Sequence, residues 1–221
     1  MSDTDSLGTV EESVDMNCYK KLKTISINTL TNVEIYKYKK IDKYFKNNGN
    51  NKIPIMVGII NKESKISLRM LDWFVTKYTK SNSKKVTYKL DDDNPYFNIG
   101  LSYKAQLSTY TKKYFDPFRR RKKFDYYYIH NGKAKRLKTT IGQLNFFKWI
   151  FEKKILEYIE KYYDDLVSAM KISNKEEKKK KKAKSRKKVL EKQKKEKQTV
   201  KNNIDIQTEQ KKKVSVVISF E

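Results

Sequence analysis

The sequence has one cysteine, Cys18, and one histidine, His130, among 221 residues. A single cysteine excludes an intrachain disulfide and suits a reducing compartment. A structural zinc site needs about four ligands, usually rich in thiolates, so we expect no metal site and no cofactor. No apolar run approaches the roughly 20 residues of a membrane span, and the acidic, polar start is unlike a secretory signal. These absences are typical of a soluble, intracellular protein.

Glycine is also rare, with six residues, and none falls in a phosphate-binding G-x-x-x-x-G-K-[ST] or G-x-G-x-x-G pattern. Cys18 and His130 lie in different predicted segments, which disfavours a cysteine–histidine pair for nucleophilic catalysis. Three aspartates at 91–93 invite a metal-binding or nuclease interpretation, but a solvated hairpin tip explains them better because no Glu or His is nearby in sequence. An enzymatic function is therefore not excluded, but no residue pattern in the sequence favours one.

Acidic residues are outnumbered two to one, by 52 lysines and arginines to 26 aspartates and glutamates. Residues 1–16 carry −5, whereas residues 17–51 carry +6, residues 52–172 carry +14 and residues 175–201 carry +11. The excess therefore belongs to the expected globular part as well as to a tail. Such a charge repels itself unless an anionic partner offsets it, and nucleic acid is the commonest such partner.

Arginine is scarce: the chain has 46 lysines and six arginines. The lysine, asparagine, isoleucine and tyrosine content suits an AT-rich genome, in which a run of three arginines stands out. Arg119, Arg120 and Arg121 lie side by side, which indicates a need for planar, bidentate guanidinium groups. Chance clustering in a short basic loop is the alternative.

The composition divides the chain into five parts. We expect a disordered acidic tail at 1–16, a basic arm at 17–51 that forms one or two strands or packs on the core, and an α+β core at 52–172. A lysine-rich tail at 173–213 is either disordered or a solvated helix, and 214–221 is a short strand-like end.

Within the core, the continuous apolar run at 52–60 predicts a buried strand, because it is short and β-branched. Ile66, Met70, Phe74 and Tyr78 recur every four residues and predict a helix over about 65–80. Residues 86–90 and 97–103 flank a turn-rich DDDNP and predict a β-hairpin, and a short helix over 105–113 should end before Asp116-Pro117.

The clearest local signal is FDYYYI-HNGK-AKRLKTT, in which Asn131-Gly132 supplies the positive φ angles of a hairpin turn. Alternation places Tyr126 and Tyr128 on one face and Tyr127 on the other. Thr140 and Gln143 fit a capping box, which begins one long helix over 140–171. The predicted fold class is α+β: a small mixed or antiparallel sheet with two β-hairpins packed on one long C-terminal helix and one or two shorter helices, flanked by disordered tails.

The loop and hairpin around 112–138 combine the cations that bind phosphates with aromatic rings on which bases stack. We expect binding that is independent of sequence, with DNA as the favoured partner and acidic proteins as a second class. The lysine-rich tail adds a cluster that also resembles a nuclear-localisation signal. The predicted nucleic-acid-binding residues are Lys112, Lys113, Arg119, Arg120, Arg121, Lys122, Lys123, Lys133, Lys135, Arg136, Lys138, Lys180, Lys181, Lys182, Lys184, Arg186, Lys187 and Lys188.

Three stretches carry a resemblance: PIMVGIINKESKISLRMLDWFVTKYTK (54–80), YKAQLSTYTKKYFDPFRRRKKF (103–124) and TTIGQLNFFKWIFEKKILEYI (139–159). Together they resemble a family of uncharacterised proteins of nucleocytoplasmic large DNA viruses, the mimivirus-like giant viruses especially. The resemblance covers about half of the chain and neither tail, and it transfers no catalytic residue. It implies a setting in the virion or in a viral factory of the host cytoplasm.

Our first hypothesis is a non-enzymatic, basic nucleic-acid-binding protein of a large DNA virus, which supports genome packaging, the virion core, or replication and transcription. The alternative is a virion or factory scaffold protein that uses its core as a protein–protein interaction module. A nucleic-acid-processing enzyme is the third hypothesis.

Overall fold

The computed structural model describes residues 16–48, 51–82, 86–91, 96–212 and 219, with side chains beyond residue 186 described only at Glu191 and Ser219. The acidic tail expected at 1–16 and the strand expected at 214–221 therefore lie almost wholly outside the described residues. The chain divides into two compact units, Met1–Leu166 and Val167–Glu221. None of the described helices is both long and apolar enough to cross a bilayer.

Residues 17–48 are largely helical, so the strands considered for this segment are wrong, whereas the alternative, packing on the core, agrees with the structure. The segment contains helices α1 (Met16–Asn28) and α2 (Asn32–Asn48). Thr31 begins α2 with a capping box, because Glu34 accepts hydrogen bonds from the Thr31 backbone N–H and hydroxyl. Tyr38, Ile41 and Phe45 repeat at helical spacing on α2 and are all buried, so this segment contributes to the core.

The apolar run at 52–60 is helix α3 (Lys52–Asn61), so the strand predicted there is also wrong. Pro54 lies in the first turn, where its missing N–H removes no intrahelical hydrogen bond. Ile53, Met56 and Ile59 are buried at spacings of three residues, which is a helical burial pattern. Short β-branched runs are ambiguous between strand and buried helix, and here packing on the core favours the helix.

The helix predicted at about 65–80 is confirmed over residues 68–81. It consists of α4 (Leu68–Trp73), a π-helical turn η1 (Phe74–Tyr78) and α5 (Thr79–Ser81). Ser67 caps it, with its side chain accepting a hydrogen bond from the backbone N–H of Met70. Met70, Leu71 and Phe74 are almost completely buried.

The first hairpin is present but short. Strands β1 (Thr87–Tyr88) and β2 (Phe97–Asn98) pair antiparallel. Asn98 then caps helix α6 (Ile99–Phe115), so residues 99–103 are helical rather than extended. As predicted, α6 ends before Asp116-Pro117.

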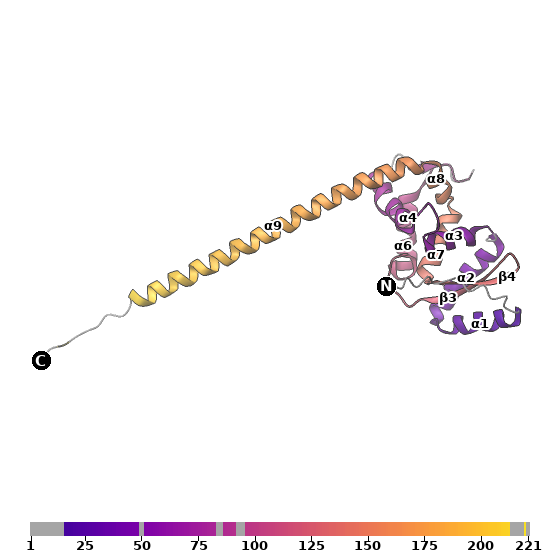
Figure 1. Ribbon diagram of the computed structural model, residues 1–221, viewed down its shortest axis with the longest axis horizontal. Helices are drawn as coiled ribbons and strands as arrows, with labels where there is room; N and C mark the ends of the chain where they lie inside the picture. Colours follow the sequence, from indigo (N-terminus) through magenta and orange to yellow (C-terminus); the bar gives the residue numbers. More distant parts are fainter. Residues whose placement is uncertain (1–15, 49–50, 83–85, 92–95, 213–218, 220–221) are drawn as a thin grey trace, which may run out of the picture. The chain divides into compact units, whose positions relative to one another are not determined.

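The second hairpin matches its prediction, with strands β3 (Phe124–His130) and β4 (Lys133–Thr139). Asn131 and Gly132 have φ values of 51° and 74°, as a type I′ turn requires. Tyr126 pairs with Leu137 and both are buried, whereas Tyr127 is half-buried on the other face. The hairpin lies between α1 and α2 (Figure 1).

The long helix predicted over 140–171 begins as expected, since Thr140 accepts a hydrogen bond from the Gln143 N–H. It is not continuous: α7 (Ile141–Glu152) is followed by α8 (Ile155–Lys161) and α9 (Tyr163–Lys212). Lys154 has a φ of 50°, in the left-handed region, which ends α7. Tyr88 of β1 donates a hydrogen bond to the carbonyl of Lys153 at this break.

Aromatic side chains of α7 form the centre of the first unit. Phe146, Phe147 and Trp149 are buried, and Trp149 donates its indole N–H to Ser102 of α6 at 3.0 Å. Phe45 of α2 packs edge-on against Phe151, with ring centroids 6.3 Å apart. Tyr126 of β3 packs against Tyr38 and Phe45, so α2 covers the face of the hairpin that carries Tyr126. The helices, together with the antiparallel β1–β2 and β3–β4 pairs, confirm the predicted α+β class.

Candidate nucleic-acid interface

The arginine triplet lies in the connection between α6 and β3, and the start of that connection is fixed. Phe115 is fully buried, and Asp116 accepts a hydrogen bond from the backbone N–H of Phe118 at 2.8 Å through its Oδ1 atom. This Asx-type turn reverses the chain directly after the helix. Pro117 is buried, whereas Phe118 is exposed. The turn therefore anchors the chain immediately before the first arginine.

Helix α7 packs against the end of α6 and the turn that follows it. Asn145 is buried and donates its side-chain amide to the carbonyl of Tyr114 at 3.1 Å. Gly142 allows a close approach, because a Cβ there would lie 3.0 Å from the carbonyl oxygen of Asp116. Two positions on one helix face thus secure the end of α6 and the turn.

The far end of the connection is fixed by Phe124, which is buried and packs edge-on against Tyr38 with ring centroids 5.9 Å apart. Between the two anchors, Arg119–Lys123 adopt no regular structure and all five side chains are exposed. Within the described part of the chain, no acidic side chain is paired with any of them. We call these five residues the basic loop.

Strand β4 carries two further predicted residues, of which Lys138 lies near the start of β3 and Arg136 lies opposite the middle of β3. Lys138 pairs with Asp125 in the register and Arg136 pairs with Tyr127; both basic side chains are exposed. Lys112 and Lys113 are also exposed, in the last turn of α6. Lys112 and Lys113 therefore precede the turn that leads into the basic loop, and Lys138 lies beside the strand that follows the loop.

Lys133 and Lys135 are placed differently. They lie opposite His130 and Tyr128, on the face that also carries Tyr126 and Leu137. Lys133 is exposed and Lys135 is half-buried. Phe124 and His130 are six positions apart, about 20 Å along the strand, so Lys133 lies at the opposite end of the hairpin from the basic loop. The predicted alternation of faces is confirmed, but these two lysines do not join the basic loop.

The remaining predicted residues lie on α9. Lys180, Lys181, Lys182, Lys184 and Arg186 are exposed, and the side chains of Lys187 and Lys188 lie outside the described residues. Nine of the eleven residues at 178–188 are basic and none is acidic. At a rise of about 1.5 Å per residue, the helix carries one positive charge per about 1.8 Å of its axis. Duplex DNA carries one negative charge per about 1.7 Å of axis.

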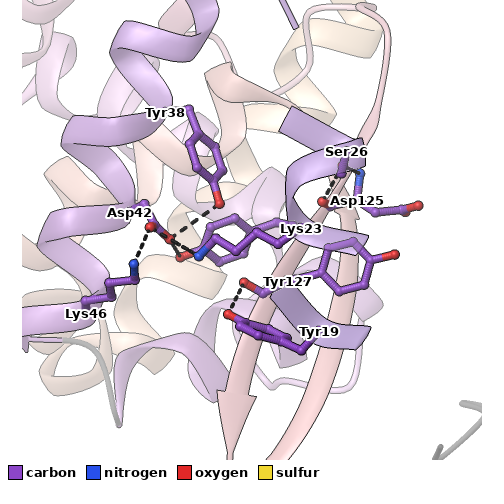
Figure 2. A network of polar contacts seen from close by, with 9 residues as sticks. Tyr19, Lys23, Ser26, Tyr38, Asp42, Lys46, Asp125 and Tyr127 are labelled. Carbon is purple, nitrogen blue, oxygen red and sulfur yellow. Dashed lines mark hydrogen bonds and ion pairs between the residues drawn. The ribbon is translucent and has the colours of Figure 1, made fainter. Parts of the chain in front are cut away.

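Sequence reasoning missed a polar network around Asp42 of α2 (Figure 2). Asp42 is 8% exposed and forms ion pairs of 3.0 Å with Lys23 of α1 and with Lys46. The hydroxyls of Tyr38 and Tyr126 donate to the same carboxylate at 3.5 Å and 3.3 Å. Burial, and then the charge of Asp42, raises the pKa of both tyrosines, so they stay protonated donors. Burial lowers the pKa of Lys23 despite its pairing with Asp42.

Helix α1 also covers the free edge of β3. Ser26 exchanges hydrogen bonds with both the N–H and the carbonyl of Asp125, at 3.1 Å and 2.7 Å. Two residues further along β3, the carbonyl of Tyr127 accepts a hydrogen bond from the Tyr19 hydroxyl at 3.3 Å (Figure 2). Because these backbone groups point away from β4, the two α1 side chains satisfy an edge that would otherwise be open to pairing. The network and this edge contact are structural, and they hold β3 beneath α2.

Among the described residues, no group of three or more His, Cys, Asp or Glu side chains is placed to hold a metal ion. Cys18 is exposed on α1, and His130 lies at the end of β3 beside the turn. The aspartates predicted to form a hairpin tip are described only at Asp91, which is exposed.

Comparison with known proteins confirms the viral resemblance. An uncharacterized protein of Acanthamoeba polyphaga mimivirus is 41% identical over 128 residues, which are 57% of this chain and 49% of that protein. The chain thus spans about half the length of this curated relative, and the similarity supports a viral origin. No solved structure matches the chain significantly. A family model matches residues 17–221, so the chain belongs to DUF7197, a family of unknown function.

Proposed function

We propose that this protein binds nucleic acid through the phosphate backbone, without preference for a base sequence. The basic loop is the observation that carries the proposal: five adjacent exposed cations are held between buried anchors at Phe115 and Phe124. Their irregular backbone leaves the side chains open to solvent, and arginine forks match the geometry of phosphate oxygens. The proposed surface also includes four exposed cations of the flanking elements: Lys112, Lys113, Arg136 and Lys138.

The lysine-rich part of α9 supports the proposal independently. Four pairs of basic residues lie at i, i+4 spacing within 178–188. Each pair destabilises the isolated helix by about 0.2–0.5 kcal/mol, so the run costs about 1–2 kcal/mol until counter-charges neutralise it. A polymer of phosphates supplies such charges at matching density. In a large DNA virus, this activity would serve genome packaging, the virion core, or replication and transcription, in the virion or the host cytoplasm.

The test is a salt titration of binding to a duplex oligonucleotide, with the full-length chain. We expect the affinity to fall steeply with salt, because each phosphate contact adds about 0.9 to the slope of log K against log salt. Changing Arg119, Arg120 and Arg121 to Gln should make the slope shallower by about 2–3, and so should changing Lys180, Lys181 and Lys182 to Gln.

The matched control changes Lys20, Lys21 and Lys104 to Gln, three exposed lysines outside the proposed surface with the same change in net charge. If the loop and α9 variants bind with the affinity and slope of this control, the proposal is wrong. An Arg-to-Lys triple variant of the loop keeps the charge, so it should keep the slope while binding more weakly. Equal affinity would show that the arginines act only as charges.

A further inference from the structure

Helices α2 and α6 bring together tyrosines and lysines that are more than 70 residues apart in the sequence. Lys37 of α2 places its Nζ atom 4.9 Å from the ring centroid of Tyr110 and 5.0 Å from that of Tyr114, both on α6. Lys113 lies 4.7 Å from the Tyr114 ring. With Tyr36 and Lys40, these form what we call the lysine–tyrosine patch: Tyr36, Lys37, Lys40, Tyr110, Lys113 and Tyr114.

The outer part of the patch is open to solvent. Tyr36 is 60% exposed, and the Nζ atom of Lys40 lies 4.5 Å from its ring centroid. A hydrogen bond with Lys40, together with the charge of that lysine, lowers the pKa of Tyr36. Tyr38, two residues after Tyr36 on the same helix, is buried and faces the Asp42 network. One side of α2 therefore packs in the core, and the opposite side contributes Tyr36 to the lysine–tyrosine patch.

The backbone of α6 is distorted at this place. Thr111 has a φ of 59° and a ψ of 164°, non-helical angles that a β-branched residue rarely adopts. The distortion falls between Tyr110 and the last turn, which carries Lys112, Lys113 and Tyr114. The buried ring of Phe115 and the hydrogen bond from Asn145 to the Tyr114 carbonyl hold that turn in place. Strained backbone that surrounding packing maintains is typical of functional sites.

Along the chain, the patch is followed by Phe118, which is 51% exposed, and then by the basic loop. Exposed rings interleaved with cations are the recurring chemistry of single-strand binding, in which bases stack on the rings and phosphates contact the cations. A duplex hides the base faces within its own stack, so it gives such rings nothing to stack on.

We infer that the lysine–tyrosine patch binds single-stranded nucleic acid, with Tyr36 and Phe118 as stacking residues and with Lys37, Lys40 and Lys113 contacting phosphates. This inference rests on the proposed function and specifies the form of nucleic acid. The rings most accessible to bases are on α2 and in the turn after α6, so the strand follows the surface from α2 towards the basic loop.

The experiment compares a single-stranded oligodeoxynucleotide, the RNA of the same sequence and the duplex of the same length, by fluorescence anisotropy with the full-length chain. Wild type should bind the single strands more tightly than the duplex. Tyr36→Ala and Phe118→Ala should each weaken single-strand binding about 5- to 150-fold, the range measured for loss of one stacked base. Their salt slopes should be unchanged, because neither side chain is charged. The two single-strand arms distinguish DNA from RNA as the ligand.

Tyr96→Ala is the matched control, since Tyr96 is 84% exposed but lies in the β1–β2 hairpin, and it should bind as wild type. Far-ultraviolet circular dichroism establishes that each variant is folded. If no nucleic acid binds, the proposed function fails. If single strands and duplex bind equally, and the Tyr36 and Phe118 variants match Tyr96→Ala, the inference fails and the proposed function stands.

Discussion

Asp42→Asn should strongly destabilise the protein, because it removes the charge at the centre of the network that joins α1, α2 and β3. The Lys23 and Asp42 side chains are only 14% and 11% exposed. Breaking a buried ion pair by neutralising one partner costs about 3–5 kcal/mol, since the other charge stays buried without compensation. Lys46 is 64% exposed, so its pair with Asp42 contributes at most about 1 kcal/mol.

Two effects reduce the net cost. The Lys23 ammonium can regain part of its hydration through its exposed fraction, and the asparagine oxygen can still accept a hydrogen bond from Tyr38 or Tyr126. We therefore expect a loss of about 2–4 kcal/mol in the free energy of unfolding. Equilibrium unfolding in urea measures it, at constant pH and salt. Glu160→Gln, which changes the net charge equally at an exposed position, should stay within about 0.5 kcal/mol of wild type.

A double-mutant cycle with Lys23→Met isolates the pair. Once the lysine is absent, Asp42→Asn should cost less, with a coupling energy of about 1–3 kcal/mol. A loss for Asp42→Asn no larger than that for Glu160→Gln, or a coupling energy near zero, would refute the buried network.

Three further predictions concern the segment before the basic loop and the buried tyrosines. Gly142→Ala should destabilise the protein by about 1 kcal/mol in urea unfolding, because the added Cβ meets the carbonyl of Asp116 at 3.0 Å. Gly58→Ala, whose Cβ would meet only Ser64 at 3.9 Å, should instead stabilise helix α3 by about 0.5–1 kcal/mol, and the same sign for both variants would contradict the close approach. Thr111→Gly should raise the free energy of unfolding by about 1 kcal/mol, since glycine adopts positive φ without strain; a loss of stability would show that the distortion is not strained. Stability should be highest below pH 10 and fall above it, because burial raises the pKa of Tyr38 and Tyr126 in the folded state while the unfolded tyrosines ionise near pH 10; urea midpoints that do not change between pH 9 and pH 11 would contradict this.

The site was predictable where it depends on neighbouring residues. The basic loop is exposed because Asp116-Pro117 ends the preceding helix and the β3 strand begins at Phe124, and both signals are local. The alternation of faces along the hairpin likewise follows from a period of two and the Asn131-Gly132 turn. The lysine–tyrosine patch was not predictable, since its two halves meet only after α2 and α6 have packed.

The sequence by itself determined the excess of positive charge, the β3–β4 hairpin, the start of α7 at Thr140 and the exposed arginines. The charge follows from composition alone, and the hairpin and the helix start depend on steric or capping preferences within a few residues, which act before any tertiary contact forms. Tertiary structure alone decided that residues 52–60 are helical, that the long helix breaks at Lys154, and that α1 and α2 enclose the hairpin. The physical reason is that a short apolar segment takes the backbone form that buries its side chains against distant partners, and those partners are not adjacent in the sequence.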